Sequence, residues 1–464
     1  MALSKEFIEQ IQALMPDEAE RLVQAIEHSD ASVSVRINRA KGATEVCAEA
    51  KRVPWCGEGA TLAQRPQFTF DPDFQSGRYY VQDASSMFIA YAIRRVVTGA
   101  VRYLDLCAAP GGKTTAALSA LPEGSLVVAN EIVPLRAKIL RENVIKWGAA
   151  NCVVTHNRPA DFAPLEGFFD VIATDVPCSG EGMMRKDDEA VAQWSRALVD
   201  ECAQRDHSII DDVWGCLRPG GLLIYSTCTY NRDENEAIVE YIVDKYGAES
   251  IDLAPDDDWN IMYALNSKCH CYRFLQHRID GEGLFLSVLR KPDGVVKLQN
   301  AKQKPRKQKG GAKPQPVPAV ARQWIAEPDK YELSVCGDEV VALPKAFAAE
   351  IAQLNDKLKV LHSGITIGNI KGKNLVPSHA LALSTELCAE AFTQVEVDYA
   401  TAVAYMRGEA VVLADAPRGY VLLRHGGAVI GFANNLGNRA NNLYPKEWRI
   451  RSSHAPEQKP QVVK

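Results

Sequence analysis

Two cysteines lie where the sequence could carry out covalent chemistry on a substrate. Cys178 occurs in Asp175-Val-Pro-Cys178, at the end of the apolar run 169–177, and Cys228 follows the apolar run 220–227. A free cysteine is usually just a small buried side chain. Two cysteines that each follow an apolar strand are expected on the same rim of one sheet. The pair therefore predicts thiol chemistry rather than packing alone.

A glycine-rich turn earlier in the chain has the features of a nucleoside-binding site. The segment 105–114, DLCAAPGGKT, closes an apolar strand and opens a helix. A phosphate-binding P-loop would need a glycine five residues before Gly112, where Cys107 stands. Glu131 ends the next strand, where a carboxylate can accept hydrogen bonds from both hydroxyls of a ribose. The turn and this acid together predict a nucleoside cofactor.

Alternating strands and helices must position these residues. The alternation predicts right-handed crossovers and a parallel sheet, and ligands of such sheets bind beyond the carboxyl ends of the strands. We therefore expect an α/β fold with a Rossmann-like, doubly wound sheet. A long helical stretch is expected from about Asp188 to Leu217. The apolar runs expected to form the sheet are 101–107, 125–131, 151–156, 169–177 and 220–229.

Two thiols, an acid and a nucleoside cofactor suit the covalent activation of a pyrimidine base. A thiolate that adds to carbon 6 of cytosine makes carbon 5 able to attack an electrophilic methyl group. An acid that bonds ring N3 and the exocyclic amine stabilises the charge that develops. A base must then remove the carbon 5 proton so that the thiol can leave. The residues alone leave open whether Cys178 or Cys228 attacks.

Three motifs, LDLCAAPGGKT, DVPCSGEGMMRKD and YSTCTYNRDENE, resemble in sequence and order those of the NOL1/NOP2/Sun family of RNA cytosine-5 methyltransferases. The segments SVRIN, GRYYVQDASSM and HRIDGEGLF are similar to the family as well, and 418–451 resembles a PUA-like domain. The likeness extends from about residue 30 to 451 and is closest to bacterial members that act on 16S ribosomal RNA. It implies methylation of carbon 5 of a specific cytosine in 16S ribosomal RNA, with S-adenosyl-L-methionine as the cofactor.

The resemblance also implies a role for each motif residue. Cys228 would be the nucleophile that forms the adduct with cytosine carbon 6, and Cys178 would assist the breakdown of that adduct. Asp175 would contact the target base and also lie near the cofactor. The residues implied to bind S-adenosylmethionine are Cys107, Ala108, Ala109, Pro110, Gly111, Gly112, Lys113, Glu131, Asn157, Arg158 and Asp175.

The stretch after the third strand departs from the family pattern. The family usually places an Asp there, in an HDGR-like stretch, that bonds the adenine amine. Here the sequence is His156-Asn157-Arg158-Pro159, so Asn157 could substitute for that Asp, while Arg158 opposes the pattern. Residues 185–187, Arg-Lys-Asp, follow the Pro-Cys loop, and either an RNA contact or a solvated charged loop fits them.

Charge is distributed unevenly along the chain. The formal net charge is −5, yet residues 297–464 hold 23 Lys and Arg against 15 Asp and Glu. A cation-rich C-terminal part suits a polyanionic partner, although an uneven spread of solvated charges would give the same counts. The segment 297–319 holds seven Lys or Arg and no acid, and it is too poor in apolar residues to build a core. We expect it to be a basic linker.

The remaining patterns divide the chain into domains. SVSVRIN in the N-terminal part alternates like an edge-forming strand, and AVVLADA, GYVLLRHG and GAVIGFANN near the C-terminus are expected to be strands of a small β-barrel. The domains expected are an N-terminal RNA-binding α+β region (1–78), a methyltransferase domain (79–296), the basic linker (297–319), a small mixed domain (320–384) and a PUA-like RNA-binding domain (385–464).

Several function classes remain to be weighed. Without a secretory signal or an apolar run of membrane-spanning length, we expect a cytoplasmic, monomeric protein that binds 16S ribosomal RNA or the small ribosomal subunit and no membrane. The alternatives are a transfer-RNA cytosine-5 methyltransferase and a non-catalytic RNA-binding protein of ribosome assembly. Cys269-His270-Cys271 could suggest a metal, but no second ligand pair follows at finger spacing. We expect no metal and an ordinary loop-to-strand segment there.

Overall fold

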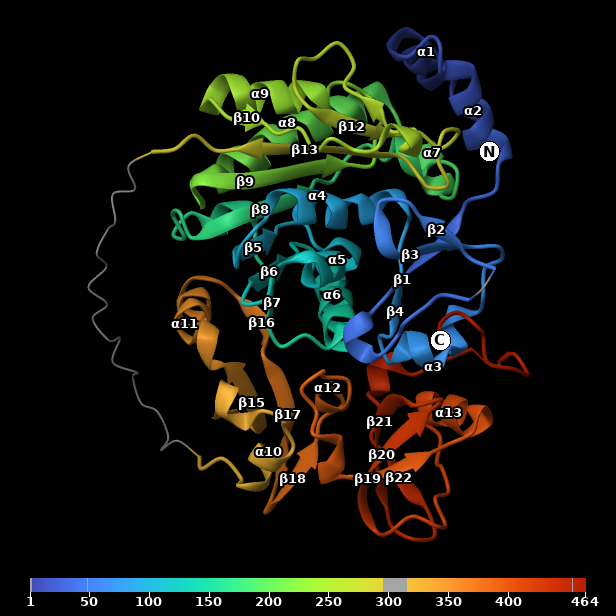
Figure 1. Cartoon of the computed structure of the whole chain (residues 1–464), viewed down its shortest axis with the longest axis vertical. Helices are drawn as coiled ribbons and strands as arrows, with labels where there is room; N and C mark the ends of the chain where they lie inside the picture. Colours follow the sequence, from blue (N-terminus) through green and yellow to red (C-terminus); the bar gives the residue numbers. More distant parts are fainter. Residues whose placement is uncertain (1, 48, 295–314, 453) are drawn as a thin grey trace.

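The computed structural model describes residues 2–47, 49–294, 315–452 and 454–464 (Figure 1). Most of the predicted basic linker, 297–319, falls outside these ranges. The strands of the described residues form four sheets, one large and three of four strands each. In this part of the chain, no helix combines the length and the apolar character needed to span a membrane.

The largest sheet is the one that carries the cysteines. Its strands follow the order β11-β12-β13-β9-β8-β5-β6-β7-β16, with β10 pairing beside β13. The run from β9 to β7 is parallel, whereas β13 is antiparallel to β9. Its strands are β5 (Arg102–Asp105), β6 (Leu126–Asn130), β7 (Cys152–Thr155), β8 (Phe169–Asp175), β9 (Leu217–Thr227), β10 (Glu249–Ser250), β11 (Met262–Tyr263), β12 (Cys271–Phe274), β13 (Leu284–Arg290) and β16 (Val360–Ser363).

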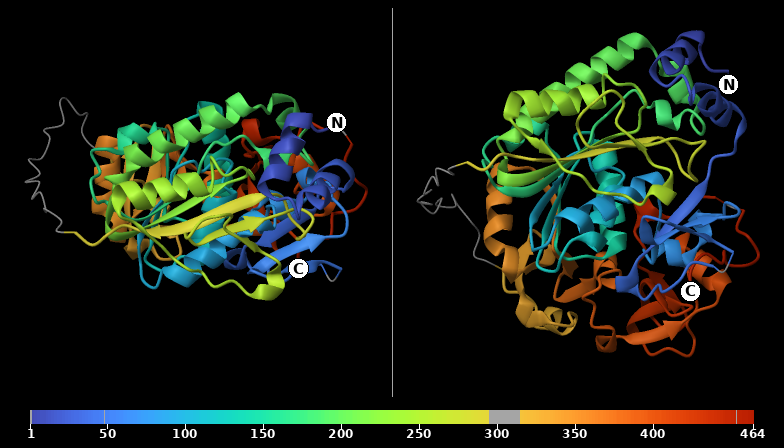
Figure 2. Two further views of the ribbon diagram at one scale, coloured as in Figure 1. Left: turned by 90° about the horizontal axis from the view of Figure 1, so that it is seen from above. Right: turned by 45° about the horizontal axis from the view of Figure 1, so that its top comes forward.

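Helices cover both faces of this sheet and bury alternate residues of each strand, as the views in Figure 2 show. Along β6, Val127 and Ala129 join the core on one face, and Val128 joins the core on the other. This double burial explains why the strands are continuous apolar runs. One face is covered by α4 (Phe88–Val96), α5 (Gly112–Ala120) and α6 (Pro134–Trp147), the other by α8 (Arg196–Trp214), α9 (Glu236–Tyr246) and α11 (Ala348–Lys357).

The N-terminal region supplies a helix pair and a four-stranded sheet. Helices α1 (Lys5–Leu14) and α2 (Ala19–His28) pack against α7 (Asp188–Gln193), which follows the Cys178 loop. The sheet has the order β2-β3-β1-β4, and the predicted boundary at residue 78 divides it, because β4 starts at Tyr79. Its elements are β1 (Val33–Ile37), β2 (Lys51–Val53), β3 (Cys56–Leu62), the short helix α3 (Pro72–Gln75) and β4 (Tyr79–Val81).

The two C-terminal sheets lie below the large sheet in Figure 1 and share one core. The first has the order β14-β15-β17-β18 and the second β19-β20-β21-β22. Strand β16 lies between β15 and β17 in the chain but pairs with β7 of the large sheet. Their elements are α10 (Val320–Gln323), β14 (Tyr331–Cys336), β15 (Glu339–Pro344), β17 (Ile365–Lys371), β18 (Asn374–Pro377), α12 (His379–Ala382), β19 (Thr393–Glu396), α13 (Tyr399–Met406), β20 (Gly419–His425), β21 (Ala428–Asn435) and β22 (Ala440–Asn442).

The doubly wound sheet expected from the sequence is present, but three local predictions are wrong. The stretch 188–217 is broken at Trp194 and Ser195 into α7 and α8, and it ends in the first residue of β9. Strand β1 is an inner strand rather than an edge, because β3 and β4 pair with its two sides. AVVLADA forms only an isolated bridge at Val411. Cys269 and His270 precede β12, as expected of a loop-to-strand segment.

Candidate active site

The two predicted cysteines meet at the carboxyl ends of β8 and β9. The Cys178 and Cys228 sulfur atoms are 3.2 Å apart, and the Cys228 backbone N–H donates a hydrogen bond to the Cys178 sulfur over 3.3 Å. They come from adjacent parallel strands, whose register pairs Asp175 with Ser226. This register is what brings two residues fifty positions apart in the sequence into contact.

The surroundings of the Cys178 thiol affect its protonation. The contact with Cys228 and burial hold the pKa of the Cys178 thiol well above its ordinary value, and the Glu234 carboxylate raises this pKa further. A thiol that stays protonated is a poor nucleophile but can exchange a proton with a neighbour. The Cys178 thiol is therefore held in its protonated form, in contact with the Cys228 sulfur.

An ion pair lies next to the cysteines. The Lys113 Nζ atom is 2.8 Å from Asp175 Oδ2, and the Ser226 hydroxyl donates to Asp175 Oδ1 over 2.8 Å. Burial alone would lower the pKa of Lys113, but the Asp175 carboxylate outweighs it and holds this pKa above its ordinary value. Lys113 is therefore a charged donor, and Asp175 has a fixed orientation from which it can bind the polar edge of a base.

The glycine-rich turn 107–113 connects β5 to α5, as predicted. Gly111 caps the helix with a φ of 116°, a left-handed conformation that favours glycine. Two side chains of α6 fasten the turn, because Arg136 donates to the Ala109 carbonyl and Asn143 donates to the Pro110 carbonyl, each over 2.8 Å. Below the turn, burial raises the pKa of Asp105 to about 7, although the hydrogen bond from Thr114 opposes this.

Glu131 lies just after β6, as predicted, and the backbone two residues later orients its side chain. Its Oε1 atom accepts a hydrogen bond from the Val133 N–H over 2.8 Å, and Arg136 lies 3.8 Å from its Oε2 atom. A carboxylate can accept about four hydrogen bonds, so capacity remains for the two hydroxyls of a ribose. The turn and Glu131 thus fit a nucleoside cofactor.

Asn157 and Arg158, in contrast, have partners that point away from this role. Asn157 accepts from the Lys359 N–H over 3.0 Å and donates to the Lys359 carbonyl over 3.3 Å. The Asn157 amide thereby fastens the start of β16 to the large sheet. Arg158 is exposed and pairs with Asp161 three residues later. Their binding of the adenine stays a prediction, and these contacts do not support it.

Two buried acids under the cysteine loops were not anticipated from the sequence. Glu181 accepts hydrogen bonds from the N–H groups of Tyr230 and Asn231, each over 2.8 Å, and so ties the Cys178 loop to the Cys228 loop. Glu234, which comes from the Cys228 loop, bonds the Cys178 loop in turn, because it accepts hydrogen bonds from both the N–H and the hydroxyl of Ser179. The signal that could have found them is a glutamate within a few residues after each motif cysteine, three after Cys178 and six after Cys228.

Arg185 does not face an RNA partner. Its guanidinium pairs with Glu282 at 3.1 Å, and the two side chains are only 5% and 2% exposed. It also donates to the Gly281 carbonyl over 2.8 Å. Of the charged residues after the Pro-Cys loop, Arg185 is structural, while Lys186 and Asp187 are exposed.

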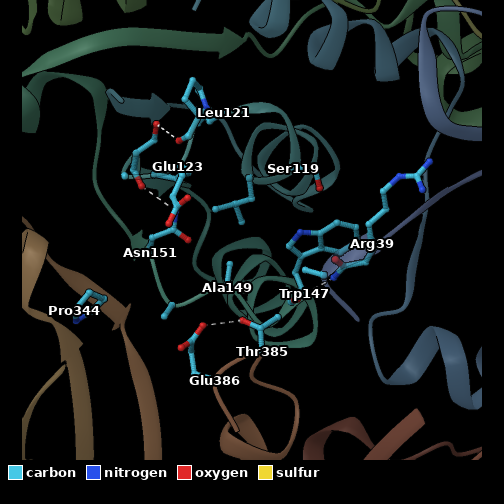
Figure 3. A pocket seen from close by; sticks show the side chains of 18 of the residues that line it. Arg39, Ser119, Leu121, Glu123, Trp147, Ala149, Asn151, Pro344, Thr385 and Glu386 are labelled. Carbon is cyan, nitrogen blue, oxygen red and sulfur yellow. Dashed lines mark hydrogen bonds between the residues drawn. The ribbon is translucent and has the colours of Figure 1, made fainter. Parts of the chain in front are cut away.

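A hollow of about 510 Å³ elsewhere in the molecule does not belong to this site (Figure 3). It lies at the amino ends of the parallel strands, where α5 returns to β6, and Trp147 and Glu386 are among the residues that line it. Ligands of doubly wound sheets bind at the other edge. None of the described residues that line it belongs to the predicted site.

The fold and the site define the class of the protein. A Rossmann-like sheet, a nucleoside-binding turn after its first parallel strand and an acid after the second are the features of a methyltransferase domain. The family described as 16S rRNA methyltransferase RsmB/F matches residues 98–290. The N-terminal domain of 16S rRNA methyltransferase RsmF matches residues 3–84, and the methyltransferase RsmF PUA domain matches residues 392–450.

Curated relatives and a solved structure agree with this class. The chain is 32% identical to ribosomal RNA small subunit methyltransferase F of Citrobacter koseri over 410 residues, which cover 85% of this chain and 84% of the relative. The protein of the same name from Enterobacter sp. is 30% identical and covers 85% and 83%. A methyltransferase homologue from Pyrococcus horikoshii, 26% identical with a TM-score of 0.52, covers 62% of this chain and 95% of its own.

The chain belongs to the ribosomal RNA small subunit methyltransferase F family. The resemblance stated from the motifs is thereby confirmed, as are the RNA methyltransferase class and the C-terminal PUA domain.

Proposed function

We propose that this protein methylates carbon 5 of a specific cytosine in 16S ribosomal RNA, with S-adenosylmethionine as the methyl donor. The observation that carries the proposal is the pair of cysteines with sulfur atoms 3.2 Å apart, beside the ion pair of Lys113 and Asp175. The relatives' names, which specify ribosomal RNA of the small subunit, support the substrate.

The residues divide the chemistry as follows. The Cys228 thiolate adds to carbon 6 of the cytosine, while Asp175 and Lys113 bind the polar edge of the ring and stabilise the charge that develops. When bound, S-adenosylmethionine would be held by the turn 107–113 and by Glu131, and it would supply the methyl group to carbon 5 as its sulfonium–methyl bond breaks and the thioether leaves. A base then takes the carbon 5 proton, and the bond between carbon 6 and Cys228 breaks. Cys178, whose sulfur lies 3.2 Å from that of Cys228, assists this breakdown by donating a hydrogen bond to the departing sulfur and keeps its own proton.

Two cysteine substitutions test this division. With 16S ribosomal RNA from cells that lack the protein, Cys228→Ala should form no covalent adduct and no 5-methylcytosine. Cys178→Ala should accumulate a protein–RNA adduct that is stable in denaturing gels. If Cys228→Ala traps RNA instead, the two roles are reversed.

The substrate is tested separately. Bisulfite mapping of cells with and without the protein should show one cytosine of 16S ribosomal RNA that is methylated only when the protein is present. A differential signal confined to transfer RNA would replace the proposed substrate. Absence of any differential methylation, together with intact RNA binding, would favour a non-catalytic protein of ribosome assembly.

A further inference from the structure

A hollow of about 380 Å³ lies beside the catalytic loops and has no part in the chemistry described above. Its walls come from β2 and the turn after it (51–55), from the turn 258–260 and from the segment 276–280 that follows β12. Figure 1 shows β2 and β12 at the same end of the large sheet as α7, the helix that follows the Cys178 loop. The N-terminal sheet and the methyltransferase domain thus form the hollow together.

Short hydrogen-bonded links connect the hollow to the cysteines. Gln276, which lines it, donates to the Gly182 carbonyl over 2.9 Å, and the Gly182 N–H donates to the Cys228 carbonyl over 2.8 Å. Ala84 also lines the hollow, and the preceding residue, Asp83, accepts a hydrogen bond from the Glu282 N–H over 2.8 Å. One layer of backbone therefore separates the hollow from the loop that carries Cys228.

The charged side chains of the hollow are suited to a phosphate. Lys51 pairs with Asp280 at the wall. Among the described residues, the guanidinium groups of Arg52 and Arg278 have no carboxylate within ion-pair distance, and Arg52 is exposed. A phosphate beside these two groups would release counterions and gain charge-assisted hydrogen bonds. The carboxylates on or next to the wall are those of Asp258, Asp280 and Glu18.

An aromatic ring and a buried acceptor complete the hollow. Trp259 is half-buried and is held edge-on by Trp55 and Tyr91, with ring centroids 6.1 and 5.0 Å away. A tryptophan fixed in this way is a platform on which a base can stack. Gln276 is only 5% exposed, and its amide oxygen has no hydrogen-bond partner among the described residues. Such an orphaned acceptor is costly unless a donor, such as an amino group of a base, satisfies it.

We propose that this hollow is a subsite for a nucleotide of the RNA next to the methylated cytosine. Arg52 and Arg278 bind its phosphate, and Trp259 stacks on its base. The proposal rests on the proposed function and explains how the strand is held open. A cytosine that enters the pocket of Cys228 must leave its stack, so the neighbouring nucleotides lose a stacking partner that the protein has to replace.

Steady-state methylation of 16S ribosomal RNA from cells lacking the protein tests this subsite. Arg52→Ala with Arg278→Ala should raise the KM for RNA about tenfold and reduce the slope of log KM against log salt by about one to two. The kcat at saturating RNA and the KM for S-adenosylmethionine should stay within twofold. The matched control removes Lys371 and Lys373, two exposed cations at the far turn between β17 and β18, and should change neither parameter in this way.

Conservative variants separate binding from folding. Arg52→Lys with Arg278→Lys should keep most of the RNA affinity, and Trp259→Ala should weaken binding at least about fivefold while Trp259→Phe restores part of it. An equal KM for RNA in the double alanine variant and in the control variant that lacks Lys371 and Lys373 would overturn the proposal. So would a loss confined to assembled small subunits, which would indicate a protein partner. Failure of the proposed function is distinguishable, because the wild-type protein would then produce no 5-methylcytosine at all.

Discussion

The buried carboxylate of Glu181 should determine both stability and the rate of adduct formation. Besides the N–H groups of Tyr230 and Asn231, it accepts hydrogen bonds from the Trp194 indole over 2.9 Å and from the Gln10 amide over 2.8 Å. Glu181→Ala leaves the two buried backbone N–H groups without acceptors, at about 1–3 kcal/mol each. We therefore expect the free energy of unfolding to fall by about 2–6 kcal/mol.

The same substitution should impair catalysis more than substrate binding. The two N–H groups lie two and three residues after Cys228, so their release lets the Cys228 loop move away from Cys178. A displacement of about 1 Å in a reacting group can cost roughly 100-fold in rate. Single-turnover adduct formation at a temperature well below the melting transition measures this, with Glu189→Ala on the exposed side of α7 as the control. Wild-type adduct kinetics in a Glu181→Ala protein of unchanged stability would refute the reasoning.

Three further predictions follow from single contacts. Gly182→Ala should destabilise the protein by about 1–3 kcal/mol and slow adduct formation, because its Cβ atom would lie 2.6 Å from the Gly283 Cα atom. Unfolding and adduct assays measure both effects. The control Gly215→Ala, which has open space around it, should show neither effect. Asp105 has a folded pKa of about 7 against an ordinary 3.8, so the unfolded chain ionises first as pH rises. Stability relative to Asp105→Asn should therefore fall by a few kcal/mol between about pH 4 and 7, and parallel stability curves would contradict this. Asn157→Ala should lower stability by about 1–2 kcal/mol and leave the KM for S-adenosylmethionine unchanged, and a large rise in that KM would instead support an adenine contact.

The parts of this structure that the sequence predicted are those where a local pattern has one physical solution. A strand buried on both faces must be apolar throughout, so the runs that became β5 to β9 were identifiable. The Gly111 turn was identifiable for the same reason, because a left-handed cap before a helix favours glycine. The predicted positions of Cys178 and Cys228 follow from the strands, since the carboxyl ends of parallel neighbours lie at one rim.

The features that the sequence did not predict depend on contacts between residues far apart in the chain. Alternation in SVSVRIN indicates a strand with two different faces, but it cannot show whether one or two strands pair with it. The division that places a small mixed domain at 320–384 stays a prediction, and chain order alone gives no sign that β16 within it extends the large sheet through β7. The adenine contact of Asn157 stays a prediction, and the sequence could not show that its side chain bonds the backbone of Lys359, 202 residues away.

These long-range contacts change how the N-terminal region should be understood. It was expected to bind RNA, but its helix α1 also reaches the base of the catalytic loops. The Gln10 amide donates a hydrogen bond to the Glu181 carboxylate, and Phe7 packs edge-on against Trp194 with ring centroids 5.3 Å apart. Glu181 in turn holds the loop of Cys228. Removal of α1 should therefore reduce adduct formation even on an RNA bound at saturating concentration, whereas a module used only for RNA binding would affect the KM alone.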